Sequence, residues 1–151
     1  LTAEHVIRDS NIILVKDHKG GELLGLVIKK DPKKDLALLL VPGLVCEPAK
    51  LAEEAPKIGD TIIVFGSPMA QSHGTTLSTG VVSSVVGPCV DAGEAGCFLA
   101  TAPVGPGSSG GPAFNEKGEL VGIVQGLLRR PPFMGLLQGL KNIVDFLAKA
   151  G

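Results

Sequence analysis

The sequence predicts an all-β chain of short antiparallel strands that ends in one α-helix. Glycine and proline make up 32 of the 151 residues (21 Gly and 11 Pro), a density typical of proteins with many turns. The apolar residues before about residue 138 fall in short runs between turn residues, without a helical period. Frequent turns between short apolar runs favour antiparallel strands over helices.

The first third of the chain contains three predicted strands. The apolar runs that predict them are 11–16, 22–30 and 36–41. Turn residues at 17–21 and a break at 31–34 separate these runs, and Asp35 stands at the mouth of the third run. Residues 42–56 are polar and contain prolines. We expect them to connect two halves of the molecule, with a helical turn over 49–55.

The rest of the chain contains five more predicted strands and the helix. The strands are 61–65, 77–86, 97–102, 112–114 and 119–125. Gly80 interrupts the second of these strands and predicts a bend or bulge, and residues 115–118 predict a hairpin turn. Near the end, apolar residues recur at i, i+3, i+4 and i+7, namely Leu140, Ile143, Val144 and Leu147. This spacing predicts a helix from about 138 to 149 whose apolar face packs on the strands.

Charge and composition exclude several classes of partner. The formal net charge of −1 at pH 7 gives no long-range attraction to nucleic acid or to an anionic membrane. Five Phe, with no Trp and no Tyr, leave no platform on which bases could stack. No apolar run reaches the ~18 residues of a membrane span. We therefore expect neither a nucleic-acid partner nor a membrane span.

Three cysteines, Cys46, Cys89 and Cys97, allow at most one disulfide within the chain. Cys89 and Cys97 flank a predicted hairpin tip at 90–96, so this pair could close a disulfide. Three unrelated free thiols are the alternative. A zinc site built from the cysteines and His73 lacks a closely spaced cysteine pair, so we expect no metal and no other cofactor.

Residues 107–112 read Gly-Ser-Ser-Gly-Gly-Pro and place serine between glycines. A serine hydroxyl is a weak nucleophile until a neighbouring base takes its proton, and the intermediate that it forms needs N–H donors aimed at its oxyanion. The glycines allow a tight turn and the close approach of a substrate backbone. Ser108 and Ser109 both offer a hydroxyl here, and a plain Gly/Ser loop is the alternative.

The other two residue types of a serine-protease triad occur earlier in the chain. His5, Asp35 and Ser109 follow one another 30 and then 74 residues apart. Their surroundings resemble the Leu-Thr-x-x-His, Asp-x-Ala-Leu-Leu and Gly-x-Ser-Gly-Gly-Pro motifs of trypsin-like serine proteases, most of all those of the HtrA/Deg branch. The stretches 66–68, 75–84 and 112–126 are similar as well. The resemblance therefore covers most of residues 1 to 126.

The resemblance implies a fold of two antiparallel, six-stranded-type β-barrels with a C-terminal α-helix, all in one protease domain. Residues 1–56 would form the remainder of the first barrel and the linker. Residues 57–128 would form the second barrel, and residues 129–151 a loop and the helix. Trypsin-like folds have two strands before the catalytic His, so we expect the first barrel to be incomplete at its N-terminus.

The same resemblance implies the role of each site residue. Ser109, which precedes Gly-Gly-Pro, is the expected nucleophile, His5 the general base, and Asp35 the carboxylate that orients the imidazole. The backbone N–H groups of Gly107 and Ser109 are expected to form the oxyanion hole. A working triad then needs His5 Nε2 within about 3.5 Å of Ser109 Oγ, or somewhat farther away in a resting enzyme.

Substrate specificity is expected to depend on two segments that wall the S1 pocket in this family. Mapped on this chain, they contribute Pro103 and Val104 from one segment and Val124, Gln125 and Gly126 from the other. Neither segment contains an acidic residue. A substrate ammonium would be costly to bury there unpaired, so we expect small or aliphatic P1 side chains. The substrate backbone is expected to add as a strand beside 124–126.

We therefore expect a serine endopeptidase that cleaves unfolded or extended protein or peptide substrates. The resemblance suggests an extracytoplasmic location, periplasmic or secreted, and leaves open a homo-oligomer. One alternative is a catalytically silent, protease-like module that binds peptides or acts as a scaffold. The other is a small β-barrel whose Gly-Ser loop is a coincidence.

Overall fold

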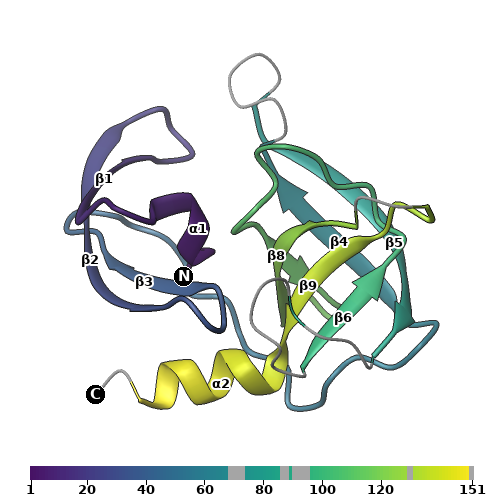
Figure 1. Ribbon diagram of the computed structural model, residues 1–151. Coiled ribbons are helices and arrows are strands. Elements are labelled where there is room, and N and C mark those ends of the chain that lie inside the picture. Colours follow the sequence, from purple (N-terminus) through teal and green to yellow (C-terminus); the bar gives the residue numbers. More distant parts are fainter. Residues whose placement is uncertain (68–73, 86–88, 90–95, 129–130, 150–151) are drawn as a thin grey trace.

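The computed structural model describes residues 1–67, 74–85, 89, 96–128 and 131–149, and it shows two β units side by side with a helix below them (Figure 1). In chain order the elements are α1 (Glu4–Ile7), β1 (Ile12–Lys16), β2 (Glu22–Asp31), β3 (Leu36–Leu40), β4 (Thr61–Gly66), β5 (Thr76–Ser84), β6 (Cys97–Ala100), β7 (Pro112–Phe114), β8 (Leu120–Leu127), β9 (Gly135–Gly139) and α2 (Leu140–Ala148).

The first unit is an antiparallel sheet of three strands in the order β1-β2-β3. Leu26 in β2 stands opposite Ile12 on one side and Leu40 on the other. Among the described residues no further strand closes this sheet, so the first half is an open sheet where a partial barrel was expected. A barrel closes only when enough tilted strands pair around its axis, and three do not suffice. Thr2 adds a short bridge to Ala37 of β3.

The second unit is a closed antiparallel barrel in the order β4-β5-β6-β9-β8-β7. Its interior is filled by buried apolar side chains, among them Ile62, Val64, Val82, Phe98, Val124 and Leu137. The bend expected at Gly80 is a point of close backbone approach, because a Cβ there would overlap the backbone of Ala102. The prediction of a second barrel followed by a C-terminal helix is confirmed.

Strand β9 corrects the sequence prediction, which left residues 129–137 in a loop and began the helix near Gln138. β9 pairs with both β6 and β8 and completes the barrel, so the barrel extends to Gly139. All five of its residues are buried, which removes the alternation that marks a half-exposed strand. The flanking glycines also read as turn residues. A second error is the helical turn expected over 49–55, since this segment forms no helix and Leu51 instead bridges to Leu120.

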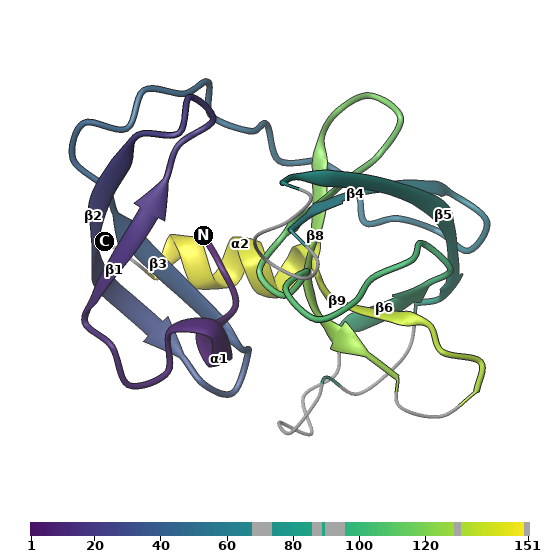
Figure 2. The same ribbon diagram turned by 90° about the horizontal axis from the view of Figure 1, so that it is seen from above.

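Helix α2 runs from the barrel to the three-stranded sheet and joins the two units (Figures 1 and 2). Its Ile143 and Phe146 are buried against Leu36 of β3 and Ile123 of β8. The ammonium of Lys29 donates to the Phe146 carbonyl oxygen at 2.7 Å and lies 4.6 Å from the centroid of the Phe146 ring. Apolar burial and a cation–π contact therefore hold the helix to the first sheet.

The cysteines resolve into one disulfide and one thiol. Cys89 and Cys97 are bonded, with an S–S distance of 2.00 Å, and Cys46 is free and exposed. Most of the expected hairpin tip at 90–96 lies outside the described residues, as does His73. In the part of the chain that the structure describes, no three His, Cys, Asp or Glu side chains form a group that could hold a metal ion. No helix in that part is long and apolar enough to cross a membrane.

The hairpin between β7 and β8 carries a polar cluster. The Asn115 side-chain amide donates to Glu119 Oε1 at 3.2 Å, and Lys50 Nζ lies 3.1 Å from Glu119 Oε2. The hydrogen bond from Asn115, followed by that from Lys50, lowers the pKa of the Glu119 carboxyl.

Candidate active site

His5 lies on α1, a single helical turn of four residues. The segment before it is fixed by two backbone hydrogen bonds between Thr2 and Ala37, of 3.0 and 2.9 Å, and by the fully buried Ala3. The His5 side chain remains 35% exposed. This helix was not predicted, because four residues are too few to show a helical period. Its effect is to hold the imidazole at the edge of the first sheet.

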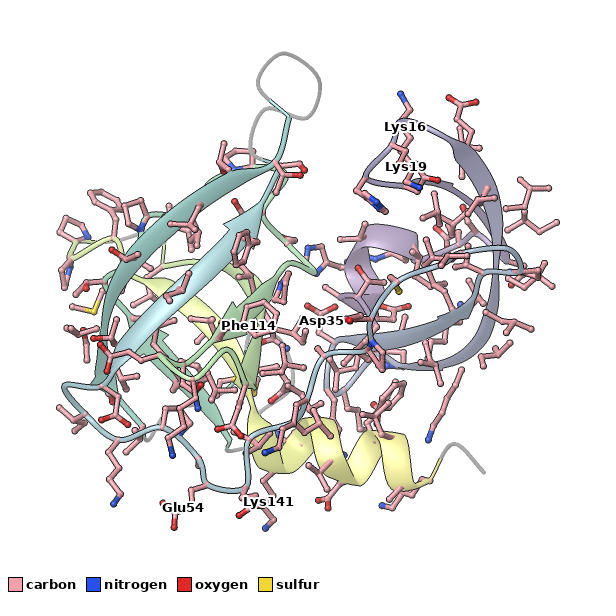
Figure 3. The ribbon with its side chains drawn as sticks, turned by 180° about the vertical axis from the view of Figure 1, so that it is seen from behind. Lys16, Lys19, Asp35, Glu54, Phe114 and Lys141 are labelled. Carbon is pink, nitrogen blue, oxygen red and sulfur yellow. A yellow bond between two sulfur atoms is a disulfide. The ribbon has the colours of Figure 1, made fainter. Side chains whose placement is uncertain are left out.

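Asp35 immediately precedes β3 and lies where the two β units meet (Figure 3). Its φ of 51° places it in the left-handed region, which aspartate tolerates better than most residues. Asp35 Oδ1 accepts the backbone N–H of His5 at 2.8 Å, and Oδ2 lies 2.7 Å from His5 Nδ1. With Nδ1 donating to the carboxylate, the neutral ring presents Nε2 as its proton acceptor.

The loop of Ser108 and Ser109 is shaped by glycines in left-handed conformations, with φ of 93° at Gly107 and 84° at Gly110. Ser108 is 4% exposed, and its hydroxyl accepts the backbone N–H of Gly105 at 3.2 Å. Ser109 is only partly buried. Ser108 is thus tied into the loop itself, and of the two hydroxyls that of Ser109 is the more accessible.

The Ser109 hydroxyl donates to the backbone carbonyl oxygen of Gln125, at 3.1 Å. Within the described residues, no hydrogen bond joins it to His5. The structure therefore contains the expected contact between His5 and Asp35 but not the one between Ser109 and the imidazole. A hydroxyl rotates about χ1 between staggered positions, so its partner can change without a change of backbone.

The serine loop packs directly against both neighbouring segments. A Cβ added at Gly110 would overlap Thr2 Oγ1 and approach Ala3 N to 3.0 Å, and one added at Gly111 would overlap the Phe65 carbonyl oxygen. Glycine permits this close approach because it has no side chain. The contact with Thr2 and Ala3 places the serine loop beside the segment that leads into α1. Residues from the two units are thus brought together.

An open hollow of about 320 Å³ adjoins the serine loop. Its lining includes Gly107, Ser109, Gly110, Phe65 and Gly66. A larger hollow of about 750 Å³ lies elsewhere on the barrel, between residues 50–62 and 115–121, and contains none of the expected site residues. The smaller hollow is therefore the one beside the expected nucleophile.

The expected walls of the S1 pocket do not line that hollow. Pro103 is exposed and Val104 is partly buried, while Val124 belongs to the barrel core. The Gln125 amide donates to the Lys34 carbonyl oxygen at 2.8 Å and so points into the junction of the two units. Of the segment 124–126, only the backbone and Gly126 are left to face a ligand.

Gln138 is a buried polar residue at the same junction that the sequence reading missed. Its amide donates to the same Lys34 carbonyl oxygen, at 2.6 Å. A signal was present in the sequence, because both glutamines interrupt apolar runs and both precede glycine. A buried polar side chain needs a hydrogen-bond partner, so a glutamine inside an apolar run predicts a specific contact.

Comparisons with known proteins identify the family of the chain. A family model described as a trypsin-like peptidase domain matches residues 1–123. A probable periplasmic serine endoprotease, DegP-like, from Pseudomonas fluorescens is 36% identical over 138 residues, which are 90% of this chain and 29% of that protein. The serine protease Do-like HtrA of Bacillus subtilis is 30% identical over 130 residues, 82% of this chain and 29% of that protein.

Solved structures show the same fold. The serine endoprotease from Yersinia pestis superimposes with a TM-score of 0.83 at 25% identity, over 99% of this chain and 52% of that one. The Rv3671c protease of M. tuberculosis, in its inactive form, gives a TM-score of 0.85 at 27% identity, over 99% of this chain and 78% of that one. The chain spans less than a third of the length of the curated relatives that it matches.

Proposed function

Because the chain belongs to the family of trypsin-like peptidase domains, we propose that it is a serine endopeptidase with Ser109, His5 and Asp35 as its catalytic triad. The observation that carries the proposal is the pair of hydrogen bonds between the Asp35 carboxylate and His5. One oxygen accepts the backbone N–H and the other the Nδ1 proton, across 30 residues of sequence. Such a pair orients an imidazole so that Nε2 serves as a base.

The proposed reaction begins when Ser109 Oγ attacks the carbonyl carbon of a peptide bond and passes its proton to His5 Nε2. Asp35 stabilises the imidazolium that forms. The tetrahedral intermediate then collapses, the C–N bond breaks, and His5 returns the proton to the leaving amine. A water molecule then attacks the acyl carbonyl carbon and passes a proton to His5 Nε2. The bond from this carbon to Ser109 Oγ breaks, and His5 returns the proton to Ser109 Oγ.

Ser109 has to exchange hydrogen-bond partners before it reacts. Its hydroxyl is held by the Gln125 carbonyl oxygen, which lies beyond the part of β8 that pairs with β7. A substrate strand that adds at this edge would offer its own backbone N–H to that carbonyl. The displaced hydroxyl would then be free to turn toward His5. On this proposal, substrate binding itself favours the reactive arrangement.

The proposed oxyanion hole consists of the Gly107 and Ser109 N–H groups. In the described part of the chain neither of them donates to a backbone carbonyl, whereas the N–H groups of Ser108, Gly110 and Gly111 all do. Two unengaged donors, one of them the N–H of the partly exposed Ser109 itself, suit a developing oxyanion. Loss of one such donor typically raises the barrier by about 3 kcal/mol.

For the substrate, we propose extended chains with small or aliphatic P1 side chains. Pro103, Val104 and the segment 124–126 provide no carboxylate to pair with a substrate lysine or arginine. Cleavage of a peptide library, with the new N-termini identified by mass spectrometry, tests this preference. A profile dominated by Lys and Arg at P1 would contradict it.

One observation favours a second candidate function, a catalytically silent module that binds peptides. The Ser109 hydroxyl is engaged by Gln125 and not by His5. A fluorophosphonate probe separates the two candidates, because it reacts only with an activated serine. We expect labelling of the wild-type protein at Ser109 and none in the Ser109→Ala and His5→Ala variants. Absence of wild-type labelling in the folded protein would favour the silent module.

The location that we propose is extracytoplasmic. The Pseudomonas relatives are described as periplasmic, and the bond between Cys89 and Cys97 is of the kind that persists in oxidising compartments. Fractionation of source cells, followed by an immunoblot of each fraction, tests this proposal. Recovery of the protein with the cytosolic fraction would contradict it.

A further inference from the structure

Two buried glutamines of the barrel hold one carbonyl oxygen of the first sheet. Gln125 of β8 and Gln138 of β9 both donate to the backbone oxygen of Lys34, at 2.8 and 2.6 Å. Gln125 is 4% exposed and Gln138 is fully buried. Lys34 immediately precedes Asp35. Two amides that are 91 and 104 residues away in sequence therefore fix the peptide group that leads into the proposed triad carboxylate.

The strand register explains why both side chains point to this carbonyl. Gln138 stands opposite Ile123 in one neighbouring strand and Cys97 in the other, so these three side chains share the face of the barrel that meets the first sheet. The register of β8 shifts between Val124 and Gly126, which makes Gln125 part of a bulge. A bulge re-aims side chains, and here the second amide reaches the same acceptor as the first.

The orientation of the Gln138 amide follows from its other contacts. Gln138 Oε1 accepts the backbone N–H of Gly139 at 3.1 Å and the side-chain amide of Asn142 at 2.9 Å. A backbone N–H can only donate, so the atom facing it has to be the oxygen. Gln138 Nε2 is then left to face Lys34. The contacts of Gln138 Oε1 therefore fix the orientation of the amide, with Nε2 as the donor to Lys34.

We propose that Gln125 and Gln138 are positioning residues for the triad, a role that rests on the proposed function. Asp35 has a left-handed backbone, and the Lys34 carbonyl next to it is hydrogen-bonded to the barrel. Because the Lys34 carbonyl is held in place, the Asp35 carboxylate is held at the position where it hydrogen-bonds to His5. Gln125 acts on the nucleophile as well, because its own carbonyl oxygen holds the Ser109 hydroxyl. Gln125 thus contacts both the nucleophile, Ser109, and the residue that precedes Asp35.

The experiment replaces the donors without removing their volume. Methionine approximates the length of glutamine but has no N–H, so the variants are Gln125→Met, Gln138→Met and the double variant. Gln138→Glu is a fourth variant, assayed at a pH where the new carboxyl is ionised, so that a carboxylate oxygen without a proton faces the Lys34 oxygen. The matched control is Leu137→Ala, on the same strand but facing the barrel core. It lowers stability without touching Lys34.

Two measurements report on positioning. The first is the fluorophosphonate reaction at Ser109, resolved into kinact and KI. The second is the NMR signal of the His5 Nδ1 proton, which depends on its hydrogen bond to Asp35 and not on turnover. Each single Met variant keeps one donor, so we expect small effects, whereas the double variant and Gln138→Glu lose roughly tenfold or more in kinact, with KI unchanged. Their Nδ1 proton signal shifts or broadens.

Leu137→Ala is expected to retain the wild-type signal and kinact at a temperature where it is folded. The inference is wrong if Gln138→Glu and the Met variants that fold keep both the wild-type kinact and the wild-type Nδ1 signal, or if Leu137→Ala loses them to the same degree. Failure of the proposed function looks different. In that case the wild-type protein is not labelled at all, while the effect of the glutamines on the Nδ1 signal persists.

Discussion

Replacing Gly110 with alanine tests whether close packing between the serine loop and the N-terminal segment aligns the proposed triad. Gly110 follows Ser109 and has a φ of 84°. A Cβ at this position would overlap Thr2 Oγ1 and lie 3.0 Å from Ala3 N, two residues before His5. The added methyl group therefore pushes apart the two segments that carry the nucleophile and the base.

The expected size of the effect has two parts. An L-residue in the left-handed region costs about 1–2 kcal/mol. Overpacking against the backbone of Ala3 adds about 1–3 kcal/mol. We therefore expect Gly110→Ala to lower the free energy of unfolding by about 2–5 kcal/mol. A shift of ~1 Å between Ser109 and His5 is expected to lower the rate of fluorophosphonate labelling by about a hundredfold.

Gly118→Ala provides the matched control. Gly118 has a similar φ of 75°, but a Cβ there meets nothing within 4 Å, and the residue lies in the β7–β8 turn. It should lose only the backbone part, about 1–2 kcal/mol, and keep the wild-type labelling rate. Urea unfolding and labelling kinetics measure both quantities. If Gly110→Ala behaved like Gly118→Ala in stability and in rate, the packing argument would be refuted.

Three further predictions concern stability. Replacing Cys89 and Cys97 with alanine should lower the free energy of unfolding by about 2.5 kcal/mol, because their bond closes a loop with a sequence separation of 8; unchanged urea unfolding would contradict this. Phe146→Ala should cost about 3–5 kcal/mol, since its ring is buried between the two units, and a loss below about 1 kcal/mol would show that α2 does not join them. The lowered pKa of Glu119 predicts stability that is fully present above its ordinary pKa of 4.5 and is lost as the pH falls through the lowered value. In Glu119→Gln the unfolding midpoint should fall less as the pH is lowered below 4.5. An unchanged pH dependence would refute this role of Glu119.

The outcome for the strands shows which signals are local. Turn residues around β1, β2 and β7 act over a few residues, and these strands lie close to where they were predicted. β9 was missed because five buried residues have no alternation to read, and its pairing with β6 and β8 is a long-range event. Helix α1 was not predicted because its four residues are too few to show a helical hydrophobic period. The membership of the trypsin-like family, expected from the motifs, is confirmed by the comparisons.

The residues and their order were enough to identify the chemical groups of the site: an imidazole, a carboxylate, and an alcohol between glycines. They were also enough to predict short strands, because turn chemistry and apolar runs are local properties. The contacts between these groups could not be predicted in this way. They are the hydrogen bonds of the Asp35 carboxylate to His5, of the Ser109 hydroxyl to Gln125, and of two glutamines to Lys34. A hydrogen bond needs two atoms within about 3 Å, and that proximity depends on the packing of both β units together.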